Sequence, residues 1–160
     1  MRECALAKEL PHTWPHLPAE RAIASSLMIR RRTALRYVLA AAMVSVGIVH
    51  FVIPGWFVSI VPAALPAPMT LVLVSGAFEI LGGLGLLAPR VRRAASVGLV
   101  LLYVSVFPAN INMIVDARAS HGIAPWLLWA RLPLQAVFIA WALYVGRDQH
   151  SGPGQSQIAQ

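Results

Sequence analysis

Charged residues are scarce in this sequence. Asp, Glu, Lys and Arg make up 12% of its 160 residues, and 58% of the residues are hydrophobic. Soluble domains carry about 25% charged residues. So few ionised side chains are too few to cover a soluble globule of this length. The composition therefore indicates one domain that lies in lipid.

Cysteine is almost absent as well, since Cys4 is the only one. This excludes an internal disulfide, a Cys-x-x-Cys redox pair and a metal site built from cysteines. The sequence shows no nucleophile–base pair and no cluster of metal ligands, so we predict no catalytic residue and no metal site. These absences argue against an enzyme that works alone.

Four long apolar runs are the main feature that is present. About 20 apolar residues form a helix that crosses about 30 Å of hydrocarbon. Runs of this length cover residues 35–53, 69–87, 94–115 and 125–145. We therefore predict an all-α fold, a four-helix transmembrane bundle that occupies residues 31–148.

The two ends of the chain show no such pattern. Residues 1–27 contain Pro11, Pro15 and Pro18 among scattered charges. We predict a disordered basic tail over residues 1–30 and a second disordered tail over residues 149–160. MIRRR directly precedes the first run, so we expect Met28 to be the true start.

Basic residues are distributed unequally between the two sides of the predicted bundle. The net charge is +7, and Arg118 and Arg131 are the only two of thirteen Lys and Arg residues on one side. Because Lys and Arg resist translocation, we predict a multi-pass protein of the plasma or inner membrane with both termini cytoplasmic. The arginines lie beside apolar runs rather than along one exposed face, so we do not expect nucleic acid as a partner.

The connection between the first two runs is unusual. Residues 55–70 carry no charge, and four prolines occur from Pro54 onward. Proline interrupts a continuous helix. We interpret this segment as lying in the interface or dipping shallowly into the bundle as a lid. A loop that is merely anchored in lipid fits the sequence equally well.

We select six candidate site residues at membrane depth, where ionisable groups are costly and usually face the bundle interior. Glu79 is flanked by Ser75, Gly76, Gly82 and Gly83, whose small size allows another helix to approach. An expected break at Pro108 would turn Asn110 and Asn112 inward. The six residues are His50, Glu79, Asn110, Asn112, Arg131 and Gln135.

Two interpretations of these residues stay open. They form either a ligand-binding polar pocket in the outer half of the bundle or a structural network. In the structural network, Glu79 and Arg131 pair to fix the register of the helices. Our sharpest hypothesis is that Glu79 joins Arg131 and the group of His50 and Asn110 in one network. Buried ion pairs often do no more than fix how helices pack.

The order of several motifs resembles the DoxX family of small four-helix membrane proteins. The resemblance runs from Arg36 to Gly146. It rests on GIVHFVIPGWFVSIVPAALPAP, LVSGAFEILGGLGLL followed by PRVRRAAS, VFPANINMIVD and RLPLQAVFIAWAL. Some members of that family are associated by name with quinone-linked sulfur oxidation or with maturation of redox enzymes. Thiol-dependent relatives would need paired cysteines, which this chain lacks.

The resemblance implies an accessory or anchoring component of a membrane redox system. Its ligand would be a quinone, and its partner a membrane or peripheral oxidoreductase. One alternative is a small-molecule or proton-coupled transporter in which Glu79 titrates. The other is a purely structural protein that binds other membrane proteins or forms a homo-oligomer.

Overall fold

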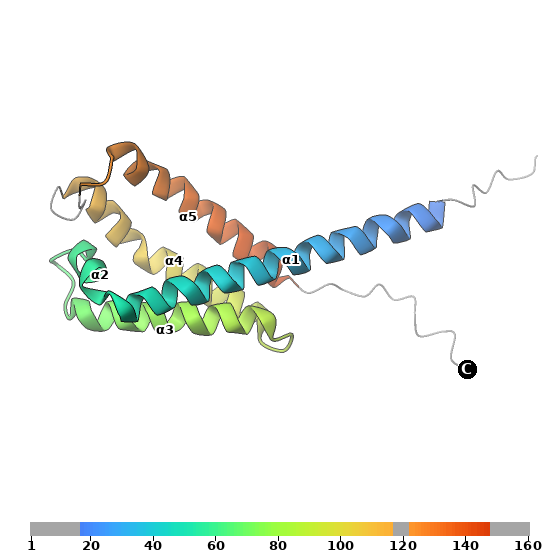
Figure 1. The fold of residues 1–160 in the computed structure, drawn as a ribbon, viewed down its shortest axis with the longest axis horizontal. Helices are drawn as coiled ribbons and strands as arrows, with labels where there is room; N and C mark the ends of the chain where they lie inside the picture. Colours follow the sequence, from blue (N-terminus) through green and yellow to red (C-terminus); the bar gives the residue numbers. More distant parts are fainter. Residues whose placement is uncertain (1–16, 117–121, 148–160) are drawn as a thin grey trace, which may run out of the picture.

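The computed structural model describes residues 17–116 and 122–147, and this part of the chain contains five helices and no strand (Figure 1). The helices are α1 (Leu17–Val52), α2 (Pro54–Ile60), α3 (Pro68–Leu87), α4 (Arg92–Val115) and α5 (Pro125–Gly146). Residues Ile23–Val52 of α1 and the whole of α3, α4 and α5 are long and apolar enough to cross a membrane. The prediction of an all-α fold with four spans is confirmed.

Proline marks where several of these helices begin. Pro54, Pro68 and Pro125 occupy the first turn of α2, α3 and α5. The ring presets the helical φ angle, and the missing N–H is not needed at that position. These three prolines therefore start helices instead of interrupting them.

Two segments differ from the expectations. Helix α1 begins at Leu17, so residues 17–30 are helical rather than part of a disordered tail. This extension is rich in Ala, Leu and Met, which favour helices, and it continues a helix already nucleated by the span. Pro108 lies inside a continuous α4, so the expected unwinding does not occur. Residues 1–16 and 149–160 lie outside the described residues.

The helices pack in the order α1, α3, α4, α5. Helices α1 and α5 meet where Arg36 Nε donates to the carbonyl oxygen of Val145 at 3.4 Å. From this contact, α5 and α1 move apart as they run toward the end of the bundle that carries α2 (Figure 1). We call the end of the bundle with Arg36 and Arg92 the arginine end, and the opposite end the α2 end.

Glycine allows α1 and α3 to lie in close contact. A Cβ atom on Gly47 would lie 2.7 Å from the carbonyl oxygen of Gly76, and one on Gly83 would lie 2.9 Å from that of Ala40. No larger side chain fits at these distances. The small residues that flank Glu79 do face protein, as predicted.

Candidate functional site

The close contact between α1 and α3 brings two predicted site residues together. His50 lies in the last turn of α1, and Glu79 lies near the middle of α3. Nδ1 of His50 is 3.2 Å from Oε2 of Glu79, and the two side chains are only 10% and 13% exposed. The hydrogen bond of Nδ1, 2.9 Å long, goes to the carbonyl oxygen of Val46 instead. Among the described residues, none donates a hydrogen bond to Oε2 of Glu79.

The pair of His50 and Glu79 is unusual because it contains a buried carboxylate oxygen that accepts no hydrogen bond from the part of the chain that the structure describes. A buried polar atom normally has a hydrogen-bond partner, because losing water without one is costly. The Glu79 oxygen has a close neighbour but no aligned donor. It can accept a hydrogen bond or a proton from a group that reaches it.

Helix α2 covers His50 and also contacts the far side of the bundle. The Phe57 ring stacks on the His50 ring, with centroids 3.7 Å apart and planes 20° apart. Trp56 meets Phe57 edge to face, with centroids 5.0 Å apart. On the other side of Trp56, Cζ of Arg131 lies 5.9 Å from the ring centroid. Helix α2, which is part of the uncharged connection, therefore packs against the other helices of the bundle.

Two amide side chains join α4 to α5. Asn110 Nδ2 donates to Oε1 of Gln135 at 2.8 Å, and Nε2 of Gln135 donates to the backbone carbonyl of Tyr103. Pro108 lacks the N–H that would bond the carbonyl oxygen of Val104, so one helical hydrogen bond of α4 is missing. The Gln135 side chain supplies a donor to the carbonyl of Tyr103, the residue before Val104.

Asn112 has a different partner. Its Nδ2 donates to the carbonyl oxygen of Ile60, the last residue of α2, at 3.1 Å. On an unbroken helix, residues two apart point about 200° apart, and Asn110 and Asn112 accordingly face different neighbours. Asn112 therefore ties α2 to α4.

Arg131 does not pair with Glu79. Its Nη1 lies 3.4 Å from Sδ of Met113, and the described residues contain no ion pair between Arg131 and Glu79. The reason is the packing order, in which α4 lies between α3 and α5. The expected single network is instead three groups: His50 with Glu79, Asn110 with Gln135, and Asn112 and Arg131 with α2.

Sequence reasoning gave no role to Phe57 or Tyr103. Phe57 is seven residues after His50, a spacing that would align them on one helix, but Pro54 lies between them. Tyr103 donates its hydroxyl to Sδ of Met43 at 2.8 Å, in the apolar core. Because His50 lies on α1 and Phe57 on α2, their spacing along the chain does not predict the stacking, and nothing in the sequence indicated the Tyr103 contact.

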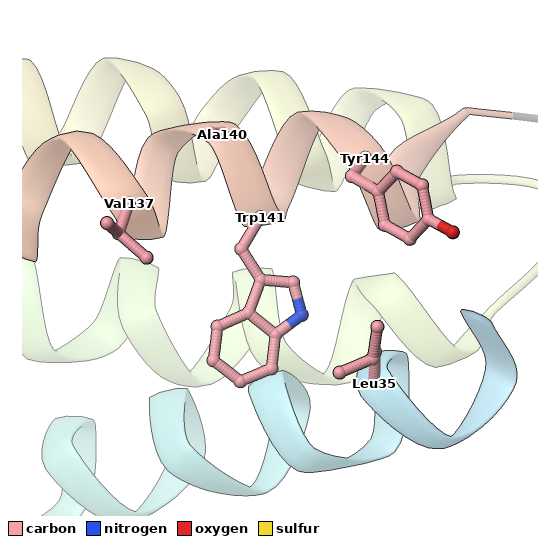
Figure 2. Close-up of a pocket in the computed structure, with 5 residues that line it drawn as sticks. All are labelled: Leu35, Val137, Ala140, Trp141 and Tyr144. Atoms are coloured by element: carbon pink, nitrogen blue, oxygen red, sulfur yellow. The ribbon is translucent and has the colours of Figure 1, made fainter. Parts of the chain in front are cut away.

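One open cavity lies away from all six predicted residues. It has a volume of about 400 Å³ and lies between α1 and α5 at the arginine end (Figure 2). Its walls are Leu35, Val137, Ala140, Trp141 and Tyr144. Within the described residues, no group of three His, Cys, Asp or Glu side chains could hold a metal ion.

Comparison with known proteins identifies a family whose model matches most of the described helices. Residues 39–146 match the model of a family described as Domain of unknown function (DUF8561). The match runs from the middle of α1 to the end of α5 and includes every residue of the three polar groups. No curated protein and no solved structure matches the chain.

Proposed function

The chain belongs to the DUF8561 family. We propose that it binds a quinone, held in its reduced hydroquinone form, or a similar flat amphiphile as an accessory component of a membrane redox system. The pair of His50 and Glu79 carries this proposal. A hydroquinone offers hydroxyl donors on an aromatic ring. Glu79 has an acceptor oxygen without an aligned donor, and Phe57 presents an aromatic ring against the neighbouring His50. The resemblance to the DoxX family points to the same class of ligand.

In this proposal α2 acts as a lid. Oε2 of Glu79 is buried behind His50, and Phe57 stacks on that histidine. A ligand would reach the carboxylate when α2 moves away from the bundle. The hydrogen bond from Asn112 to the carbonyl oxygen of Ile60 would hold α2 in the closed position. Glu79 then accepts a hydrogen bond from the ligand hydroxyl. The electron transfer itself belongs to a partner oxidoreductase.

The test is native purification in mild detergent, with mass spectrometry of the lipids, quinones and proteins that co-purify. We compare the unmodified chain with Glu79→Leu, which removes both acceptor oxygens. Ser75→Ala is the matched control, because Ser75 lies one turn away on α3 and bonds only its own helix, at Val72. Quinone should accompany the unmodified chain and the control, and be lost from Glu79→Leu. Equal quinone in all three samples contradicts the proposal.

A structural role is the second candidate, and the amide contacts favour it. Asn110, Gln135 and Asn112 use their hydrogen-bonding groups within the protein. Such contacts are typical of residues that hold membrane helices together. If only bulk phospholipid and a protein partner co-purify, this second function is the better one.

We also propose that both termini are cytoplasmic, with the arginine end inward in the plasma or inner membrane. Support comes from Arg36, Arg92 and Arg147, which lie at the same end of the bundle. Single cysteines at positions 5, 91 and 152 in a Cys4→Ser background should resist a membrane-impermeant thiol reagent in intact cells. One at Ser120 should react. Reaction at position 91 before lysis contradicts this orientation, and reaction after lysis is the control.

A further inference from the structure

The cavity at the arginine end has an apolar floor and faces the membrane. Leu35 comes from α1, and Val137 and Ala140 come from α5 (Figure 2). Leu35 is 39% exposed and Val137 is 56% exposed, so the floor is open to the surrounding lipid. The cavity exists because α5 diverges from α1 beyond their contact at Arg36 and Val145. Its shape and chemistry suit a hydrocarbon chain.

A cation lies at one end of this apolar surface. Cζ of Arg32 is 4.6 Å from the centroid of the Tyr144 ring, and Tyr144 is itself a wall of the cavity. Arg30 and Arg31 precede Arg32 on the same helix. Arginines next to the apolar part of a membrane helix attract anionic lipid headgroups. The cavity therefore combines an apolar wall with positive charge at one end.

We propose that this cavity binds one anionic phospholipid, with an acyl chain against Leu35, Val137 and Ala140 and the phosphate at Arg32 beside Tyr144. Inorganic phosphate would make no use of the apolar floor, and a neutral amphiphile would make no use of the arginine. The lipid fills the space that α1 and α5 leave between them. This site lies at the opposite end of the bundle from His50 and Glu79 and does not depend on the function proposed above.

The first test removes the charge. The full chain, purified in mild detergent, is titrated with phosphatidylglycerol, phosphatidylcholine or inorganic phosphate, and binding is followed by native mass spectrometry and by melting temperature. Arg32→Gln should weaken phosphatidylglycerol binding about fivefold. Arg31→Gln removes the same charge about 100° away around the helix and should have little effect. Equal losses in both variants overturn the site.

The second test fills the cavity. Ala140→Trp places a large side chain on its floor and should abolish phosphatidylglycerol binding, while Ala136→Trp, one turn away and outside the cavity walls, should not. Both alanines are exposed, so neither change disturbs the core. Binding that survives Ala140→Trp contradicts the proposal. So does phosphatidylcholine binding as tight as phosphatidylglycerol, or an equal rise in melting temperature with inorganic phosphate alone.

Discussion

The arginine end and the α2 end of the bundle differ in the size of their apolar clusters and in the kind of polar contacts that they contain. The arginine end has the larger apolar cluster, formed by Leu39, Met43, Leu86, Leu99, Tyr103, Ala142 and Val145. The α2 end has a cluster of only Ile60, Met113 and Leu128, and the polar contacts of α2, α4 and α5 lie around it. Apolar burial gives little drive for helices to associate in lipid, so close packing and hydrogen bonds must do so. Both ends combine close packing with hydrogen bonds, but the larger apolar cluster lies at the arginine end and the contacts of Asn110, Asn112 and Gln135 lie at the α2 end.

This difference bears on where function resides. Closely packed apolar side chains leave no room for a ligand inside the bundle. Hydrogen-bonding groups can exchange one partner for another, as an opening of α2 would require. The interior of the α2 end is therefore the better place for a ligand, while the arginine end offers only its lipid-facing surface.

The largest expected effect comes from breaking the close packing. In Gly83→Leu, the new Cβ would lie 2.9 Å from the Ala40 carbonyl oxygen. We expect the free energy of unfolding in detergent to fall by about 3 kcal/mol, the upper range for overpacking. Gly98→Leu is the control, because a Cβ there meets nothing within 4 Å. Equal stability of Gly83→Leu and Gly98→Leu would show that the close packing of α1 and α3 does not stabilise the arginine end.

Removing the amide contacts should have a smaller effect at the other end. Gln135→Leu removes the donor to Tyr103 and the acceptor of Asn110. We expect a loss of about 1 to 2 kcal/mol in the free energy of unfolding. A double-mutant cycle with Asn110→Leu should give a coupling of about 1 kcal/mol. Ser105→Ala, an exposed serine bonded to its own helix, serves as control. Additive losses would mean that the two amides act independently.

The partner of Glu79 can be identified by comparing two cycles. Glu79→Gln combined with His50→Gln should show coupling of about 1 kcal/mol, because the two side chains are 3.2 Å apart. Glu79→Gln combined with Arg131→Gln should be additive within about 0.5 kcal/mol, because they share no contact. The measurement is again unfolding in detergent. Strong coupling with Arg131 would revive the ion pair expected from the sequence.

The smallest effect should come from shortening α1. Ile23, Leu27, Met28 and Ile29 are all about half exposed or more, and in Figure 1 this part of α1 extends beyond the bundle. A chain that begins at Met28 should insert in the membrane and unfold within about 0.5 kcal/mol of the full chain. A clear loss of expression or of thermal stability would show that the extension stabilises the bundle.

Much of the fold could be predicted because span length and hydropathy are properties of each segment alone. The expected run 69–87 corresponds to helix α3, Pro68–Leu87, and the expected run 125–145 corresponds to helix α5, Pro125–Gly146. The depth of each polar residue follows directly from its place in its span. The glycines beside Glu79 likewise indicated that this face of α3 contacts another helix.

The partners of those polar residues could not be predicted in the same way. Depth places Glu79, His50 and Arg131 near one another along the membrane normal, but it does not say which helices are neighbours. Only the tertiary structure places α1 against α3 and puts α4 between α3 and α5. The sequence by itself thus determined how many times the chain can cross and which residues lie deep. The packing order decided that Glu79 meets His50 instead of Arg131, because side chains touch only across helices that are adjacent.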